Sequence, residues 1–129
     1  MLDDLGKPVF DVVPRAPGLY RLIFHGAPEQ QRDRVYVGES DSLRRRLSSN
    51  YRNPGATQKT SLRINELLRE HLAEGGSVDL ELVTEAVVSP DGAERTELDL
   101  TLRASRLLAE NATLVLLQLE GAVEVVNRP

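Results

Sequence analysis

Two short stretches rich in strand-forming residues constrain the fold of this chain most strongly. They span residues 19–24 and 34–38 and contain mainly aliphatic and aromatic side chains. The residues between them, 25–33, include Gly26, Pro28 and several polar side chains, which suit a hairpin loop rather than a crossover helix. We therefore expect the two stretches to pair as antiparallel strands.

A short helix is expected directly after the second strand. Ser40 or Asp41 can cap its start, and the helix should end near residue 50. Leu43 and Leu47 lie one turn apart in this segment and would form its apolar face.

A second helix is predicted with Thr60 as its cap and Gly75-Gly76 as its end. Its apolar positions follow the three-and-four spacing of an amphipathic helix. These positions are Ile64, Leu67, Leu68, His71 and Leu72.

The rest of the chain predicts further strands and one long helix. Residues 78–88 alternate in a strand-like way, residues 89–92 resemble a turn, and Leu98 and Leu100 are expected on a returning strand. A helix should then begin at the cap Thr101 and run to Leu119, before Gly121. Because apolar residues occupy most sides near 114–117, we expect this helix to be buried. A short apolar tail, 123–126, closes the sequence.

Length and composition favour one domain over residues 1–129. The expected elements make it an α+β domain, with a central antiparallel sheet of three or more strands flanked by helices. The chain is 40% hydrophobic and 28% charged, as in ordinary globular proteins. It has no cysteine, which excludes disulfides, cysteine-bound metals and thiol catalysis. Its two histidines, His25 and His71, are not spaced as in a metalloprotease motif. No stretch has membrane-spanning length and no leader pattern is evident, so we expect a cytoplasmic protein without a membrane partner.

The charge is unevenly distributed along the chain. The net charge is −4, but residues 31–70 contain nine basic and five acidic side chains, which gives this block +4 and leaves −8 elsewhere. Such a basic block is compatible with local phosphate binding. It is equally compatible with a solvated helix face.

Paired motifs at the ends of the first two strands point to a known family. Gly18-Leu19-Tyr20 and Tyr36-Val37-Gly38, followed by Arg46 ten residues after the second tyrosine, resemble the signature of the GIY-YIG nucleases. Residues 109–114, which contain Glu110, are similar to the glutamate-bearing segment of that family. Residues 126–129, which contain Asn127, resemble its asparagine-containing end. The resemblance implies the element order β-β-α-α-β-(β)-α and a metal-dependent endonuclease acting on DNA.

The residue types themselves suit phosphodiester chemistry. Helical geometry places Arg46 at the border of the buried stripe and Arg45 away from it, so Arg46 could hold two phosphate oxygens against the sheet. It could also merely cover the edge of the core. Glu110 is a lone carboxylate in a segment rich in leucine and alanine and is a natural ligand for Mg²⁺, or else a solvent-facing side chain.

The resemblance also implies specific roles. Tyr36 would be the general base, Tyr20 would orient the water, and Glu110 would be the sole protein ligand of Mg²⁺ or Mn²⁺. A free phenol has a pKa near 10, so Arg46 and the metal would have to lower the pKa of Tyr36. The residues expected to contact phosphate or nucleic acid are Gly38, Arg44, Arg45, Arg52, Lys59 and Asn127.

Two positions depart from the family pattern and keep a second function open. Glu39 stands where many family members carry a lysine, and Asn50 stands where an aromatic residue or histidine is frequent, with Tyr51 one place later. A slip of one residue could bring Tyr51 into that place. The alternative is a catalytically inactive module that binds nucleic acid or a protein. In either case, specificity would come from loops, a protein partner or a homo-oligomer.

Overall fold

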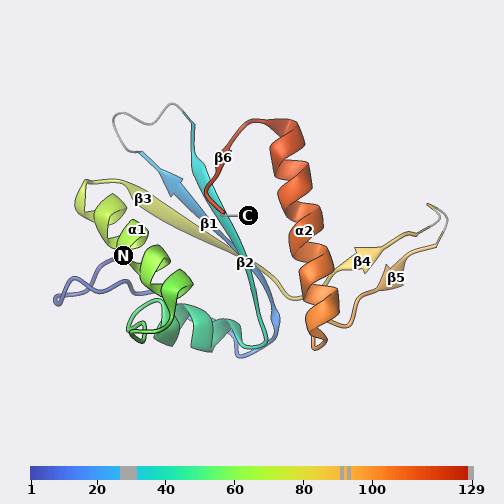
Figure 1. Cartoon of the computed structure of the whole chain (residues 1–129), viewed down its shortest axis with the longest axis horizontal. Coiled ribbons are helices and arrows are strands. Elements are labelled where there is room, and N and C mark those ends of the chain that lie inside the picture. Colours follow the sequence, from blue (N-terminus) through green and yellow to red (C-terminus); the bar gives the residue numbers. More distant parts are fainter. Residues whose placement is uncertain (27–31, 91, 93, 128–129) are drawn as a thin grey trace.

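A computed structural model of the chain describes residues 1–26, 32–90, 92 and 94–127. It is an α+β structure with a mixed four-stranded sheet in the order β3-β1-β2-β6 and a separate two-stranded hairpin (Figure 1). Parts of three interpreted segments lie outside the described part of the chain. They are residues 27–31 of the predicted hairpin loop, Asp91 of the predicted turn, and Arg128 and Pro129 at the end of the motif resemblance.

The first two predicted strands are confirmed and form the centre of the sheet. β1 (Gly18–His25) and β2 (Arg34–Ser40) pair antiparallel, with Tyr20 opposite Gly38 and Leu22 opposite Tyr36. Directly opposed residues point to the same face of a sheet. The register therefore places both predicted site tyrosines on one face.

The two outer strands differ in how much of the central pair they cover. β3 (Ser77–Val83) pairs antiparallel with the whole length of β1. β6 (Glu124–Val125) runs parallel to β2 and pairs with only two of its residues, Arg34 and Val35. The sheet is thus mixed rather than purely antiparallel, and most of β2 has no neighbouring strand on its outer side.

The main core lies on the sheet face that carries the tyrosines. Side chains from β1, including Tyr20 and Phe24, pack there against the short helix and α1 (Lys59–Ala73). The second helix was correctly predicted, but Thr60 is not its cap, because the helix already begins at Lys59 and the preceding residue is Gln58. It ends as predicted, before Gly75, whose φ of 89° suits glycine.

The short helix after β2 is also present, with an unexpected geometry. Residues 43 and 44 are α-helical, and η1 (Arg45–Asn50) is a π-helix. The helical segment as a whole begins at residue 43, and Ser42 caps this start, because its Oγ accepts the Arg45 N–H at 3.3 Å. The predicted caps were Ser40 or Asp41. Ser40 instead accepts the Ser42 N–H at 3.1 Å and so supports the turn that precedes the helix.

The long helix α2 (Arg103–Glu120) packs on the opposite face of the sheet (Figure 1). Leu117 joins Val35 and Val37 of β2 in a second, smaller core. The helix begins two residues after Thr101, because the Asp99 side chain accepts the N–H and hydroxyl of Thr101 and holds it in a turn. Its end before Gly121, with φ of 68°, agrees with the prediction.

The expectation that α2 is buried is wrong. Only Arg106 and Leu117 of this helix are buried, whereas several large apolar side chains are more than half exposed. The sheet covers one side of the helix, and the other side is apolar without a covering layer. The exposed fractions are 52% for Leu108, 54% for Val115, 60% for Leu116 and 79% for Leu119.

The predicted strand over 78–88 is interrupted. Its alternation holds only through β3, and β4 (Val87–Val88) pairs instead with β5 (Thr96–Glu97) in a hairpin that extends away from the sheet (Figure 1). Gly92 N donates to Ser89 O at 3.1 Å, as expected for the turn. Leu98 and Leu100 lie beyond the returning strand, and Leu100 is buried in the loop before α2.

None of the described helices combines the length and hydropathy that crossing a membrane requires.

Candidate active site

All three tyrosines of the chain meet in one buried cluster. The ring centre of Tyr20 lies 6.2 Å from that of Tyr36 and 6.0 Å from that of Tyr51. The hydroxyls of Tyr20 and Tyr51 are hydrogen-bonded to each other. The predicted convergence of Tyr20 and Tyr36 is therefore present, and a third phenol joins them.

The π-helix explains how Tyr51 enters this cluster. Its backbone N–H bonds to the carbonyl oxygen of Arg46, five residues earlier, at 3.0 Å. In an α-helix, residues five apart lie on different faces, whereas the wider π turn brings them together. Asn65 of α1 donates to the Tyr51 carbonyl at 2.7 Å and fixes the end of the turn. Tyr51 is thus the residue at the end of the π-helix whose ring contacts Tyr20.

Gly38 provides the space for the Tyr20 ring. A Cβ at this position would lie 2.2 Å from the Cζ and hydroxyl of Tyr20. The expected close approach at Gly38 is therefore made by an aromatic side chain across the strand pair.

Arg46 lies beside the tyrosine cluster and is half-buried, whereas Arg45 is exposed, as predicted. Burial raises the pKa of Tyr20 and of Tyr51, and the charge of Arg46 opposes this effect only in part. Within the described residues, no carboxylate approaches the Arg46 guanidinium within 4.0 Å, and its buried Nε has no hydrogen-bond acceptor. Its positive charge thus lacks an acidic partner in this part of the chain.

A cavity of about 300 Å³ opens next to Tyr36, where the outer side of β2 is not covered by a strand. It collects side chains from β2, α1, α2 and the residues after β6. The lining residues are Tyr36, Lys59, Thr60, Arg63, Glu110 and Asn127. Four of these, Tyr36, Lys59, Glu110 and Asn127, were predicted as site residues from the sequence.

The predictions missed Thr60 and Arg63 as members of the site. Both lie in the first turns of α1, close to Lys59. Lys59 was the only basic residue predicted at this end of the helix. Arg63 could have been predicted from it, because it follows Lys59 at a spacing of four and lies on the same helix face.

Asn127 closes the edge of β2 with its side chain. Its Oδ1 accepts the Val37 N–H at 2.9 Å, and its Nδ2 donates to the Val37 carbonyl at 2.7 Å. The side-chain amide thereby substitutes for the missing strand next to Val37. Its polar atoms are engaged with the backbone, so Asn127 shapes the wall of the cavity.

The carboxyl group of Glu110 is held in a poorly solvated position. Burial raises its pKa, the nearby negative charge of Glu39 raises it further, and the charge of Arg46 partly offsets these effects. Glu110 therefore lies close enough to Arg46 and Glu39 for their charges to affect its ionisation. A cation in the cavity would stabilise its ionised form.

The phenol of Tyr36 is strongly biased toward its protonated form. Burial raises its pKa first, Tyr51 and the charge of Glu110 raise it further, and Arg46 lowers it only in part. At neutral pH the Tyr36 hydroxyl is consequently a hydrogen-bond donor. It can accept a proton only if positive charge in the cavity stabilises the phenolate.

The Glu39 side chain is neutralised by a residue that the sequence interpretation missed. Arg106 of α2 donates through Nε to the Glu39 carboxylate at 2.6 Å, and both side chains are largely buried. The same guanidinium donates to the carbonyl oxygens of Leu100 and Thr101, each at 3.0 Å. The position of Arg106 four residues before Glu110, on one helix face, was the available signal.

Three predicted arginine contacts lie outside the cavity lining. Arg44 donates to the Val13 carbonyl at 2.7 Å, Arg45 pairs with Asp41, and Arg52 pairs with Asp3. These side chains hold the N-terminal segment and the start of the short helix.

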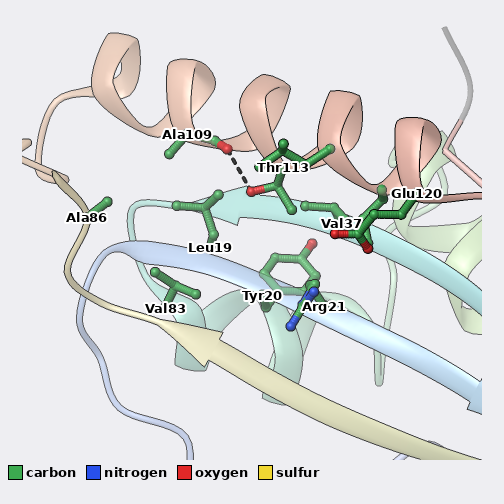
Figure 2. Close-up of a pocket in the computed structure, with 11 residues that line it drawn as sticks. Leu19, Tyr20, Arg21, Val37, Val83, Ala86, Ala109, Thr113 and Glu120 are labelled. Atoms are coloured by element: carbon green, nitrogen blue, oxygen red, sulfur yellow. Dashed lines mark hydrogen bonds between the residues drawn. The ribbon is translucent and has the colours of Figure 1, made fainter. Parts of the chain in front are cut away.

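A second cavity, of about 320 Å³, lies between α2 and the sheet (Figure 2). Leu19 and Val37 line it from the sheet, and Ala109 and Thr113 line it from α2. The Thr113 hydroxyl donates to the Ala109 carbonyl at 2.8 Å, so this wall is effectively apolar. Of the predicted site residues, only Tyr20 borders this cavity.

Among the described residues, no group of three or more histidine, cysteine, aspartate or glutamate side chains could hold a metal ion. Any cation at this site would therefore have Glu110 as its single carboxylate. Mg²⁺ accepts such a site, because it usually keeps several waters and takes further oxygen ligands from a substrate phosphate. Of the described side chains that line the cavity, Glu110 is therefore the one carboxylate that would hold Mg²⁺ or Mn²⁺, and the remaining ligands would have to come from water or a substrate phosphate.

Comparison of the chain with protein-family models, with curated proteins and with solved structures gives no match.

Proposed function

We propose that this chain is a divalent-metal-dependent endonuclease of the GIY-YIG type that hydrolyses phosphodiester bonds of DNA. The observation that carries the proposal is the cavity in which Tyr36 and Glu110 meet basic side chains of α1, with Arg46 beside them. These residues are distant in sequence. Their types are those that phosphodiester hydrolysis requires.

The arrangement of the elements supports the same assignment. The two motif strands pair at the centre of the sheet, two helical segments follow them, and a third strand precedes the helix with Glu110. This order agrees with the one that the resemblance implies as far as β3, whereas the two strands of the β4–β5 hairpin and the strand β6 after α2 go beyond it. The fold alone would not define an activity, so the weight rests on the site.

The basic side chains that line the cavity would bind the phosphate of the substrate. Lys59 and Arg63 line the cavity, and the first turn of α1 contains no acidic residue. Backbone N–H groups at a helix start favour anions, and they add to these two side-chain charges. Arg46, which has no carboxylate partner among the described residues, can bind a phosphate oxygen with its outer nitrogens.

Glu110 is the residue that would hold Mg²⁺ or Mn²⁺. When bound, such an ion would neutralise charge on the phosphate and polarise it for attack. As a phenolate, stabilised by the positive charges of Arg46, Lys59 and Arg63, Tyr36 would accept the proton of the attacking water and become the neutral phenol. Tyr20 is fully buried and bonded to Tyr51, so its contribution is to position the reacting groups.

A cleavage assay with matched controls tests the proposal. Plasmid and branched DNA are incubated with the purified chain and Mg²⁺ or Mn²⁺, and Arg46→Ala and Glu110→Gln are compared with wild type. We expect each change to lower the cleavage rate at least about 100-fold. Arg45→Ala and Glu120→Gln remove exposed charges from the same two helices and should leave the rate unchanged.

Two outcomes would reject the enzyme. Equal cleavage by wild type, Arg46→Ala and Glu110→Gln would identify a contaminating nuclease. The absence of cleavage on both substrates with either ion would leave no activity to assign.

The second candidate function is a module that binds nucleic acid without cutting it, or a protein-interaction module. The observation that favours it is the burial of Tyr36, which raises its pKa and opposes a role as base. DNA binding measured by fluorescence anisotropy separates the candidates. Binding without cleavage, weakened by Lys59→Ala or Arg63→Ala, would favour the nucleic-acid module, whereas no DNA binding would favour the protein module.

A further inference from the structure

The outer face of α2 is a continuous apolar surface. Going along the helix, Ala104, Leu108, Ala112, Val115 and Leu119 follow one another at steps of four, four, three and four residues. Such spacing places them on one side of the helix. All five are exposed, whereas Leu117, on the opposite side of the helix, is buried against Val35 and Val37 of the sheet. We refer to these five residues as the outer stripe.

A stripe of this kind is typical of an interaction surface. The four charged residues of α2 are Arg103, Arg106, Glu110 and Glu120, and the outer stripe contains none of them. Monomeric proteins rarely expose a contiguous apolar patch of more than a few hundred Å². Burying the stripe, together with Leu116, in two copies of the chain would remove on the order of 1,000 Å² from water, which is the lower range of specific interfaces.

We propose that α2 pairs with α2 of a second copy of this chain, antiparallel and around a two-fold axis between Asn111 and Ala112. About that axis, Leu108 faces Val115 of the second copy. The small Ala104 faces Leu119 of the second copy at each end. The stripe is therefore complementary to itself, as an isologous dimer interface demands.

The charges at the helix ends, although they lie outside the outer stripe, favour the antiparallel over the parallel direction. Arg103 and Glu120 are exposed at opposite ends of α2. An antiparallel pair places Arg103 of each copy at the same end as Glu120 of the other, and it also aligns the two helix dipoles favourably. A parallel pair would bring like charges together at both ends.

A membrane surface fits the same stripe less well. Helices that lie in a membrane interface carry many lysine and arginine residues on the polar face. In α2, Arg106 is buried against Glu39, and only Arg103 is an exposed basic residue. The net charge of −4 also disfavours anionic lipid.

The proposed dimer leaves the candidate active site accessible. Glu110 lies on the side of α2 that faces the sheet and the cavity, not on the outer stripe. The inference is therefore independent of the proposed function, because self-association can be measured without any substrate.

Self-association is tested first by analytical ultracentrifugation over a concentration series. We expect a monomer–dimer equilibrium, and Leu108→Glu should raise the dimer dissociation constant at least about 100-fold. Val12→Glu, at a position that is 93% exposed elsewhere on the surface, should leave the constant unchanged. Circular dichroism and thermal unfolding monitor folding, and Leu119→Glu, at a more exposed position, replaces Leu108→Glu if that variant is less stable.

The orientation is tested with single cysteines, since the chain has none of its own. Ala112→Cys lies next to the proposed axis and should form an intermolecular disulfide readily on oxidation. The two copies of an Ala104→Cys variant would be separated by about 22 Å along the helix, beyond the reach of a disulfide. That variant should cross-link only when mixed with Leu119→Cys.

Three results would overturn the inference. The first is a monomer at all concentrations up to about 500 µM, far above the dissociation constant expected for this area. The second is equally rapid self-cross-linking of Ala104→Cys and Ala112→Cys. The third is a monomer that binds vesicles of anionic phospholipid through the stripe, which would assign the surface to a membrane.

Discussion

The ion pair between Arg106 and Glu39 should be a major determinant of stability, because it joins α2 to the centre of the sheet. Only 7% of the Arg106 side chain and 18% of the Glu39 side chain are exposed. Replacing Arg106 by methionine leaves the Glu39 carboxylate buried without its cation and removes the donor to two carbonyl oxygens. Loss of one partner of a buried pair typically costs about 3–5 kcal/mol.

The double variant provides the decisive comparison. In Glu39→Leu/Arg106→Met both charges are absent, so the desolvation cost of an unpaired charge is removed. We expect it to recover at least about 2 kcal/mol relative to Arg106→Met alone, since replacing a buried pair by apolar residues is often nearly neutral. Arg103→Met, an exposed change on the same helix, should alter stability by less than about 0.5 kcal/mol.

Urea unfolding followed by circular dichroism measures these differences, with the slope of the transition checked for constancy. A loss below about 1 kcal/mol in Arg106→Met would show that the pair is effectively hydrated. Additive effects of the two single changes in the double variant would show that the two side chains do not interact energetically. Either result would refute the reasoning.

Two further predictions concern the sheet. Gly38→Ala should destabilise the fold by about 2–3 kcal/mol, because a Cβ there would meet the buried Tyr20 ring. Urea unfolding measures this loss against Gly55→Ala, where the nearest atom to an added Cβ would lie 3.6 Å away. Equal losses of unfolding free energy in the two variants would contradict the prediction. Burial lowers the pKa of His25, but Asp33 and Asp79 outweigh it and raise that pKa above 6.5. The resulting stabilisation should be complete below about pH 6.5 and be lost as pH rises through the folded-state pKa. Urea unfolding across this range should show a weaker pH dependence in His25→Asn, and an unchanged dependence would contradict the assignment.

The elements whose sequence pattern is local were predicted well. The strands β1 and β2 and the helix α1 each carry their own periodicity and their own glycine or proline boundaries. The caps were less predictable. Ser40, Asp41 and Ser42 are all good capping residues in a row, and only the backbone path decides which oxygen reaches the helix N–H groups.

The exposure of α2 could not be predicted from its composition. Apolar residues on most sides of a helix usually indicate burial, but burial requires a layer on both sides. The segment after Val83 leaves the sheet to form the β4–β5 hairpin, so only one side of α2 is covered in the described structure. The sequence alone does not show whether another element of the chain packs against the outer side of α2.

The candidate site was predicted to the extent that its residues belong to the motif segments or to the basic block of the sequence. Tyr36, Lys59, Glu110 and Asn127 converge because β2, α1, α2 and β6 meet at one edge of the sheet. Arg63 and Thr60 join them through the helix turn that carries Lys59. The engagement of Asn127 with the Val37 backbone depends on the short length of β6, which leaves those backbone groups without a strand partner.

Both departures from the expected motif pattern have a physical counterpart elsewhere in the chain. Glu39 would repel a phosphate if its charge were unopposed, but Arg106 binds it at 2.6 Å and uses it to anchor α2 one turn from Glu110. Asn50 would leave the aromatic position empty in an α-helix, but the π turn moves Tyr51 into contact with Tyr20. A comparison with the motif position by position counts Glu39 and Asn50 as mismatches. Because Arg106 balances the charge of Glu39 and the π turn brings Tyr51 to Tyr20, neither Glu39 nor Asn50 argues against the proposed function.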